Sequence, residues 1–124
     1  MTMIPFQITE WNELPVTKLP GESGFVLQRT RQYGELRIRM VEYSPGYKAD
    51  HWCARGHILF CLDGEMDTEL QDGTIHRLRA GMSYQVTDKA SLHRSSTQQG
   101  ARLFIVDGGF LGIQSTAPLW DRFH

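Results

Sequence analysis

The sequence predicts an all-β protein, either a sandwich or a barrel, on the strength of three observations. Short apolar or alternating runs recur along the chain, and turn signals separate them at close spacing. No segment sustains a helical period of apolar residues. With 124 residues the chain has the length of a single domain, which buries roughly two-thirds of the unfolded chain's surface.

The chain divides into three parts by composition. Residues 1–24 hold three prolines and are expected to form an N-terminal arm that packs on the main body. Within this arm, residues 9–14 (TEWNEL) predict one helical turn with Thr9 as its N-cap. Residues 25–108 carry the strand pattern of the barrel, and residues 109–124 form an apolar tail that we expect to dock on the barrel or on a neighbouring subunit.

About nine short strands are expected between residues 25 and 108. The main runs, in chain order, are 25–30, 35–43, 57–62, 66–70, 75–78, 82–86, 91–96 and 102–108. The segments SPGY (44–47), DGE (63–65) and QDGT (71–74) separate them, and the last two are typical of hairpin turns. The run HILFCL (57–62) is continuously apolar and predicts a strand buried on both faces.

The run at 35–43 alternates, so its two faces differ. Leu36, Ile38 and Met40 share one face, and Arg37 and Arg39 share the other. The favoured interpretation places the arginines on a solvated outer face. The alternative is an anion clamp at the mouth of a cavity, because guanidinium groups bind carboxylates in a bidentate manner.

Candidate metal ligands are concentrated in ADHWCARGH (49–57). His51 and Cys53 are two residues apart and project to the same side if this stretch is extended. His57 begins the apolar run that follows, where it shares a face with Leu59 and Cys61. An inward His93 would complete a set of three imidazoles and one thiolate. Zinc takes four ligands of this kind, and iron(II), nickel and copper also accept imidazole.

The stretch from Gly46 to Gly64 resembles the first motif of the cupin superfamily, in which a glycine precedes His-x-His, a glutamate and a second glycine. Here His51 occupies the first ligand position, Cys53 stands where the second histidine is expected, and His57 stands where the glutamate is expected. Both replacements can still bind a metal, which keeps a site plausible but changes its preference.

The second cupin motif is a glycine, a spacer that often holds Pro-x-Gly, and then a ligand histidine. Gly81 and His93 fit it, whereas Thr87 and Lys89 occupy the proline and glycine places and the spacer is one residue too long. The string DHWC…GH also resembles a small group of compact cupins named for a DHCW-type motif. The resemblance implies a single-domain jelly-roll β-barrel, also called a double-stranded β-helix.

Several other residues have simpler expected roles. Cys61 is expected in the core, and His76, in a hairpin, is expected to face solvent. Tyr84 is expected to pack in the core, although an inward hydroxyl would reach the site as a donor or acid. Asp50 and Arg55 flank the ligands and are expected at the surface or in contact with ligand residues.

The sequence thus predicts a small metal-binding cupin with His51, Cys53, His57 and His93 as ligands and a divalent transition metal, zinc first, as cofactor. One hypothesis is a metal-dependent enzyme that acts on a small molecule held in the barrel. Another is a non-catalytic module that binds a metal or a small molecule. A third makes the barrel a scaffold for oligomers, and a homodimer is compatible with either of the others. No catalytic residue is assigned.

The net charge and the number of cysteines limit which binding partners and which cellular compartment we expect. The net charge of −1 offers no basic field for nucleic acid or for an anionic membrane. No apolar stretch approaches the ~18 residues of a membrane span. Two cysteines form no disulfide framework, and the first residues do not resemble a signal peptide, so a cytoplasmic location is expected.

Overall fold

The computed structural model describes residues 3–108, so the predicted tail at 109–124 lies outside the described part. The described residues form eight strands and one short 3-10 turn, η1 (Trp11–Glu13). The strands are β1 (Thr17–Pro20), β2 (Phe25–Tyr33), β3 (Leu36–Tyr43), β4 (His57–Leu70), β5 (Ile75–Arg79), β6 (Ser83–Val86), β7 (His93–Ser96) and β8 (Ala101–Asp107). The predicted all-β class is therefore confirmed. No helix within residues 3–108 is long and apolar enough to cross a membrane.

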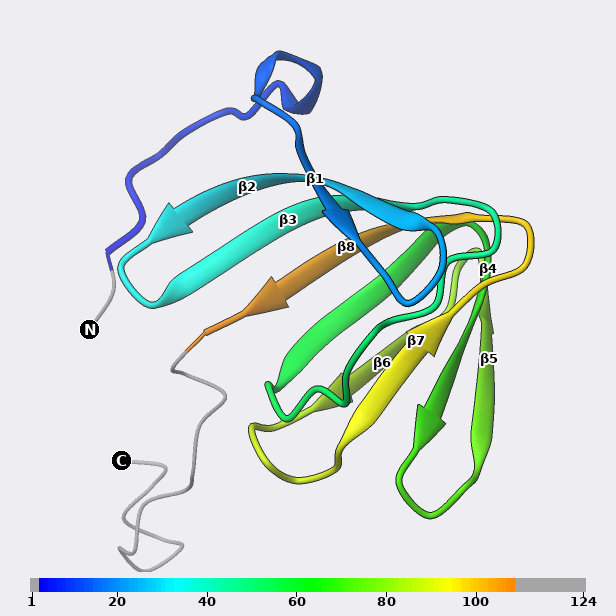
Figure 1. Cartoon of the computed structure of the whole chain (residues 1–124). Helices are drawn as coiled ribbons and strands as arrows, with labels where there is room; N and C mark the ends of the chain where they lie inside the picture. Colours follow the sequence, from blue (N-terminus) through cyan, green and yellow to red (C-terminus); the bar gives the residue numbers. More distant parts are fainter. Residues whose placement is uncertain (1–2, 109–124) are drawn as a thin grey trace, which may run out of the picture.

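The strands form two antiparallel layers that share the long strand β4. The first layer runs in the order β1-β2-β3-β8-β4, with β6 on the other edge of β4. The second half of β4 lies between β5 and β7 in the opposite layer. In Figure 1, β4 rises through the first layer, bends, and descends in the second. This bend brings the two ends of β4 to the same end of the barrel.

The bend corrects the hairpin expected at residues 63–65. The two flanking segments belong to one continuous strand, and they pair with different neighbours instead of with each other. A β-bulge shifts the register against β8 between Cys61 and Asp63, and Gly64 next to it has a φ of +76°. An irregularity of this kind lets one strand turn a corner and pass from one sheet to the other. The hairpin predicted at 71–74 is confirmed between β4 and β5.

Replacing Gly64 with alanine is expected to destabilise the fold more than the same change at Gly73, which serves as the control. Both glycines have positive φ, which costs an L-residue about 1–2 kcal/mol. A Cβ on Gly64 would also lie 2.3 Å from the Gly100 carbonyl oxygen, whereas nothing lies within 4 Å of one on Gly73. Urea unfolding should show a difference of at least about 1 kcal/mol between the variants. Equal losses would contradict the close contact at the bend.

The interior of the barrel changes from apolar to polar along its length. Its apolar part is a cluster of buried side chains: Val26, Val41, Leu59, Cys61, Met66, Leu78, Ala101, Leu103 and Ile105. The run at 57–62 contributes only its alternate residues to this core. Ile58, Phe60 and Leu62 are each 38–40% exposed, so the prediction that both faces of this run are buried was wrong. Toward the other end, the inner face carries His57 on β4 and the buried Asp107 on β8.

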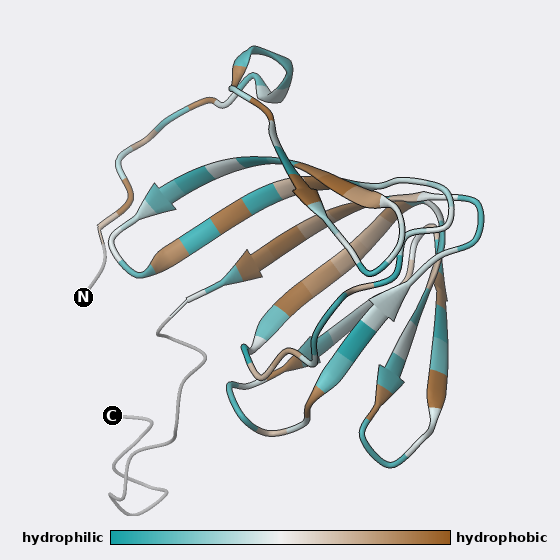
Figure 2. Ribbon diagram, viewed as in Figure 1, coloured by the Kyte–Doolittle hydropathy of each residue, from teal (hydrophilic) through white to brown (hydrophobic). Residues whose placement is uncertain are grey.

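The arginines of β3 point into the barrel, which contradicts the favoured interpretation of their face. Arg37 and Arg39 share the inner face with Val41, which is 2% exposed. Ile38 and Met40 lie on the outer face, where they align with Val106 and Phe104 of β8. On β4, Ile58 aligns with Val106 and Phe60 aligns with Phe104, so apolar rows run across β3, β8 and β4 on the outer face. Figure 2 shows the resulting apolar stretches on β8 and the first half of β4.

The N-terminal segment contributes more than an irregular arm. Its last residues form β1, which pairs with β2 at the edge of the first layer. Residues 9–14 do contain the expected helical turn, η1, but Glu10 occupies its N-cap and no side chain caps it. The Thr9 hydroxyl instead accepts a hydrogen bond from Arg31 Nε at 3.3 Å. Trp11 packs edge-on against Phe104 of the outer face, with 6.2 Å between ring centroids.

Candidate functional site

A cavity of about 430 Å³ lies at the polar end of the barrel. The side chains that matter for its chemistry are His57, His93, Cys53, His51, Arg39 and Gln28. They come from strands β2, β3, β4 and β7 and from the segment between β3 and β4. The fold thus collects in one hollow residues that are far apart in the sequence.

His57 is positioned by the start of β4 and by its neighbour β6. It pairs in register with Val86, and Leu59 pairs with Tyr84, so Tyr84 is a diagonal neighbour on the same face. The His57 Nε2 and the Tyr84 hydroxyl form a hydrogen bond of 2.7 Å. His57 itself is only 7% exposed. His57 is buried on the same face as Leu59 and Cys61, as the spacing predicts, and the Tyr84 hydroxyl reaches the site.

His93 and Cys53 are held together by the backbone. The two residues exchange a pair of hydrogen bonds, Cys53 N–H to His93 O at 2.8 Å and His93 N–H to Cys53 O at 3.1 Å. The His93 ring turns inward, where its centroid lies 4.8 Å from that of His57. The Nδ1 of His93 is 3.0 Å from the Ser91 carbonyl oxygen, which can only accept a hydrogen bond. Nδ1 therefore carries the proton, and Nε2 keeps its lone pair.

Each of the two imidazoles has one buried nitrogen that finds no hydrogen-bond partner among residues 3–108. These atoms are Nδ1 of His57 and Nε2 of His93. A buried polar atom that lacks a partner is costly, so its persistence needs a reason. When His57 donates from Nε2 to Tyr84, its Nδ1 also has a free lone pair. One nitrogen fixed by a donated hydrogen bond and the other free is the arrangement that metal-binding histidines adopt.

The electrostatics favour the metal-binding forms of His57 and Cys53, whereas they favour the protonated form of His93, which a metal would have to displace. Burial and the neighbouring His93 lower the pKa of His57 to about 4, so its ring is neutral at physiological pH. The His93 imidazole lowers the pKa of the Cys53 thiol, although burial opposes this effect. Burial also lowers the pKa of His93, but the contacts with Cys53 and with the Ser91 carbonyl outweigh it and leave the pKa raised. Burial raises the pKa of Tyr84, which therefore remains a neutral hydroxyl.

His51 lies apart from the other three candidate ligands. Its side chain is 73% exposed at the edge of the cavity, and its Nδ1 is 2.6 Å from Asp50 Oδ1. Within residues 3–108, no three His, Cys, Asp or Glu side chains are grouped closely enough to hold a metal ion. The structure thus brings His57, His93 and Cys53 into one cavity, but neither these three nor any set that includes His51 is grouped at coordination distance among the described residues. The four-residue ligand set stays a prediction.

The simpler expectations for the remaining residues are confirmed, and one residue was missed. Cys61 is fully buried in the core, and His76 is exposed on β5. Asp107, which is fully buried, received no role from the sequence although it pairs with the two inward arginines. The alternation in ARLFIVD could have revealed its burial, because Asp107 continues the buried face of Leu103 and Ile105.

No family model matches the sequence, and no curated protein resembles it significantly in sequence. Solved structures do resemble it in fold. Ectoine synthase from P. lautus has a TM-score of 0.66 and 16% identity over 88% of this chain and 80% of its own. A cupin-like protein from Thermotoga maritima has a TM-score of 0.62 and 16% identity over 73% of this chain and 74% of its own. The iron(II) form of HppE with (S)-1-HPP has a TM-score of 0.67 and 17% identity over 86% of this chain, which spans 63% of that protein.

Fold and site together define a small antiparallel jelly-roll protein with two histidines turned into its barrel. The cupin-domain structures share this architecture, and the chain therefore has the cupin fold. The resemblance to cupins inferred from the sequence is supported at this level.

Proposed function

We propose that the chain is a small cupin that binds one divalent transition metal in its barrel and acts on a small molecule there. The observation that carries this proposal is the pair of buried imidazole nitrogens without partners, on His57 and His93. A metal ion bound between the two rings would satisfy both nitrogens at once. The Cys53 thiol, beside His93, is the third donor that we propose. His51 is the fourth, and it would have to turn inward from the cavity edge.

The donor set limits the choice of metal. Imidazole suits zinc, iron, nickel and copper, and a thiolate favours zinc among these. We therefore propose zinc first. Iron(II) is the alternative, and the structurally similar HppE is named as an iron(II) protein. When bound, such a metal supplies a Lewis acid to a substrate oxygen.

The surrounding residues have distinct roles in this proposal. Tyr84 and the Ser91 carbonyl hold the rings of His57 and His93 in orientation, through the hydrogen bonds described above. The core below the rings keeps water away from them on that side. The remaining volume of the cavity, about 430 Å³, is large enough for a small organic molecule. The DHCW-type subgroup suggested by the sequence is part of this proposal.

Metal analysis of the untagged protein tests the proposal directly. We expect about one zinc or iron atom per chain, bound by protein purified without added chelator. Reloading of the stripped protein with Zn²⁺, Fe²⁺, Ni²⁺ and Cu²⁺ in separate titrations then ranks the metals. Protein that takes up none of the four with a defined stoichiometry would contradict a resident metal.

Cys53 decides between a catalytic and a non-catalytic site. Four protein ligands close a tetrahedral zinc site, whereas three leave a position for substrate. We expect cobalt-loaded protein to show a thiolate-to-metal charge-transfer band that Cys53→Ser loses, while Cys61→Ser, at the fully buried core cysteine, keeps it. A closed site that includes His51 would favour the non-catalytic binding module. A wild-type cobalt protein without the band would show that Cys53 is not a ligand.

We propose further that the chain forms a cytoplasmic homodimer. Both cysteines are free thiols, as expected in a reducing compartment.

The outer face of β4 supports the dimer. Ile58 and Phe60 on this face are 38% and 40% exposed, beside the apolar rows of β3 and β8. An exposed apolar surface of this kind marks an interface, and a second copy of the same face would cover it.

Phe60→Glu is expected to convert this dimer into a monomer, because it places a charge in the centre of the apolar rows. Light scattering coupled to size-exclusion chromatography measures the mass, with Gln71→Glu in the distant β4–β5 hairpin as the control. A monomeric wild-type protein would contradict the dimer. A variant that remains dimeric would place the interface elsewhere.

A further inference from the structure

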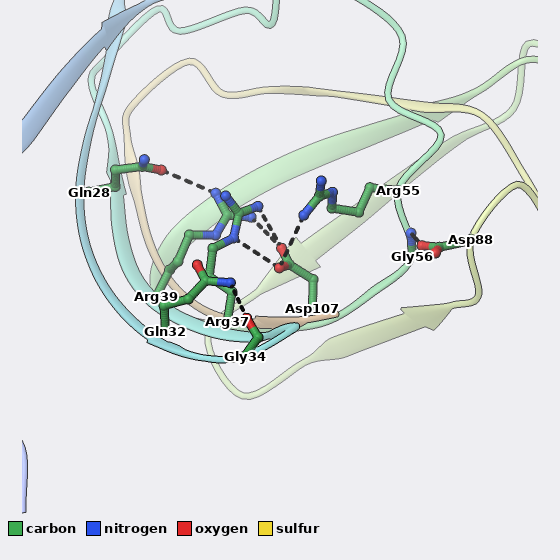
Figure 3. Close-up of polar contacts among 9 residues, drawn as sticks. All are labelled: Gln28, Gln32, Gly34, Arg37, Arg39, Arg55, Gly56, Asp88 and Asp107. Atoms are coloured by element: carbon green, nitrogen blue, oxygen red, sulfur yellow. Dashed lines mark hydrogen bonds and ion pairs between the residues drawn. The ribbon is translucent and has the colours of Figure 1, made fainter. Parts of the chain in front are cut away.

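Three arginines converge on one buried carboxylate at the polar end of the barrel (Figure 3). Arg37 binds Asp107 in a bidentate manner, with Nε and Nη2 each 2.9 Å from a carboxylate oxygen. Arg39 Nη2 lies 3.0 Å from the same carboxylate, and Arg55 Nη1 lies 3.8 Å from it. The Asp107 side chain is fully buried. One negative charge therefore stands against three positive charges.

Among the residues that the structure describes, no other carboxylate neutralises the excess positive charge. Glu35 and Asp88 line a neighbouring hollow beside Arg55, together with Lys89. Asp88 accepts a hydrogen bond from the Gly56 backbone, and within residues 3–108 neither acid forms an ion pair with the three arginines. A single Asp–Arg pair would suffice to join β3 to β8. The second and third guanidinium groups therefore need another explanation.

Arg39 is the member of the cluster that faces the cavity. Its side chain is 15% exposed, and its Nη1 donates to Gln28 Oε1 at 3.1 Å. Its Nε is buried and has no hydrogen-bond partner. Burial and the like charge of Arg37 lower the pKa of Arg39, although Asp107 opposes this effect. An anion in the cavity would give this Nε a partner and would offset the repulsion between the two arginines.

The cluster lies next to the imidazole pair. Ile58 pairs with Val106, so the same register continued by one residue places His57 beside Asp107. Arg37 pairs with Asp107 on the other side. With strands about 4.8 Å apart, the backbones of Arg37 and His57 are separated by about 10 Å. Arg39, Gln28, His57 and His93 all line the same cavity.

We propose that the ligand of this cavity is a small organic anion whose carboxylate or phosphate group is bound by Arg39, with Arg37 and Arg55 supplying the surrounding positive charge. This inference rests on the proposed function, whose substrate class it specifies. The anionic group would occupy the arginine side of the cavity, and the body of the molecule would extend toward His57 and His93. Guanidinium groups bind both kinds of oxyanion through charge-assisted hydrogen bonds.

Titration calorimetry on chelator-stripped and on metal-loaded protein tests this inference. The probes are succinate, inorganic phosphate and the neutral analogue succinamide, at matched ionic strength. We expect succinate or phosphate to bind and succinamide not to bind. Arg39→Gln should weaken binding at least tenfold, and Arg39→Lys should restore part of it. Arg102→Gln is the matched control, because Arg102 lies on β8 but is exposed and pairs with Glu42 at 3.6 Å.

The outcomes separate this inference from the proposed metal site. Metal uptake without any binding of succinate or phosphate would overturn the anion site alone. Anion binding by a protein that takes up no metal would support the anion site and contradict the metal. Equal affinity of Arg39→Gln and Arg102→Gln would show that the cluster only joins β3 to β8. If Arg39→Gln does not fold, Arg55→Gln should still weaken binding, by a smaller factor than tenfold, because Arg55 supplies charge without contacting the anion; it is 56% exposed and lies farthest from Asp107.

Discussion

His93→Ala is expected to abolish metal binding by the protein. Its Nε2 is one of the two buried nitrogens without a partner, and its ring is the one that contacts both His57 and Cys53. Loss of a residue that only orients a ligand typically weakens metal affinity by 10- to 100-fold. Loss of the ligand itself should weaken it by more than about 100-fold. Metal content after purification, and competition with a chromophoric chelator, measure the change.

His76→Ala provides the matched control for this experiment. His76 is exposed on β5, where its Nε2 bonds only to the Thr74 hydroxyl. The control should retain the wild-type metal content and affinity. Circular dichroism of both variants checks that the barrel still forms, since His93 also packs in the interior. A folded His93→Ala protein with unchanged metal content would eliminate the site that we propose.

Asp107→Asn is expected to lower the free energy of unfolding by about 3–5 kcal/mol. The substitution leaves Arg37 and Arg39 facing a neutral amide in a buried environment, and it removes the bidentate ion pair. Breaking a buried pair in this way costs far more than breaking an exposed one, because the remaining charges are still desolvated. Urea denaturation of wild type and variant measures the loss. A loss below about 1 kcal/mol would show that the cluster does not stabilise the fold.

The pH dependence of stability provides a second readout for Asp107. Burial raises its pKa, but the hydrogen bond from Arg37 and the charges of Arg39 and Arg37 outweigh this and leave the pKa lowered. A carboxyl group with a lowered pKa contributes stability above its unfolded value of about 3.9 and loses it as the pH falls through the folded value. The wild type should therefore lose this contribution below about pH 4. Asp107→Asn should lack this step.

An exposed pair on β4 and β5 is the control for the stability experiment. Asp67 binds Arg77 at 2.9 Å with the arginine 60% exposed, so Asp67→Asn should cost at most about 1 kcal/mol. The two aspartates carry the same carboxylate and differ in burial and in the number of arginines that they contact. Similar losses for both variants would contradict the role that we assign to the buried cluster.

The strand positions follow from local pattern, whereas the path of β4 does not. Alternation and turn residues place every main run close to an observed strand, within a few residues at the ends. The DGE segment, however, has the composition of a hairpin turn and adopts a bulge with positive φ at Gly64. The two outcomes use the same residues, since both need a glycine at positive φ. Which outcome occurs depends on the strands that are available for pairing on either side.

In the candidate site too, local pattern predicted some features and distant strand pairing decided the others. Spacing placed His57 on the face of Leu59 and Cys61 and left the inward orientation of His93 as a condition of the site, and both histidines are buried. The alternation of β3 was read correctly as two unlike faces, but the charged face was assigned to solvent. Arg37 and Arg39 lie inside because Asp107, on a strand 70 residues away from Arg37, enters the same interior to neutralise part of their charge. No local pattern around β3 contains that partner.

By itself the sequence determined the all-β class and the approximate strands, and it proposed a set of candidate metal ligands. Only the tertiary structure decided which face of β3 points inward, how β4 passes between the two layers, and that His51 stays at the cavity edge while His57 meets His93. The physical reason is that a two-residue period distinguishes two faces without stating which one is buried. That choice is made by the pairing of distant strands, which places each face against a particular set of neighbours.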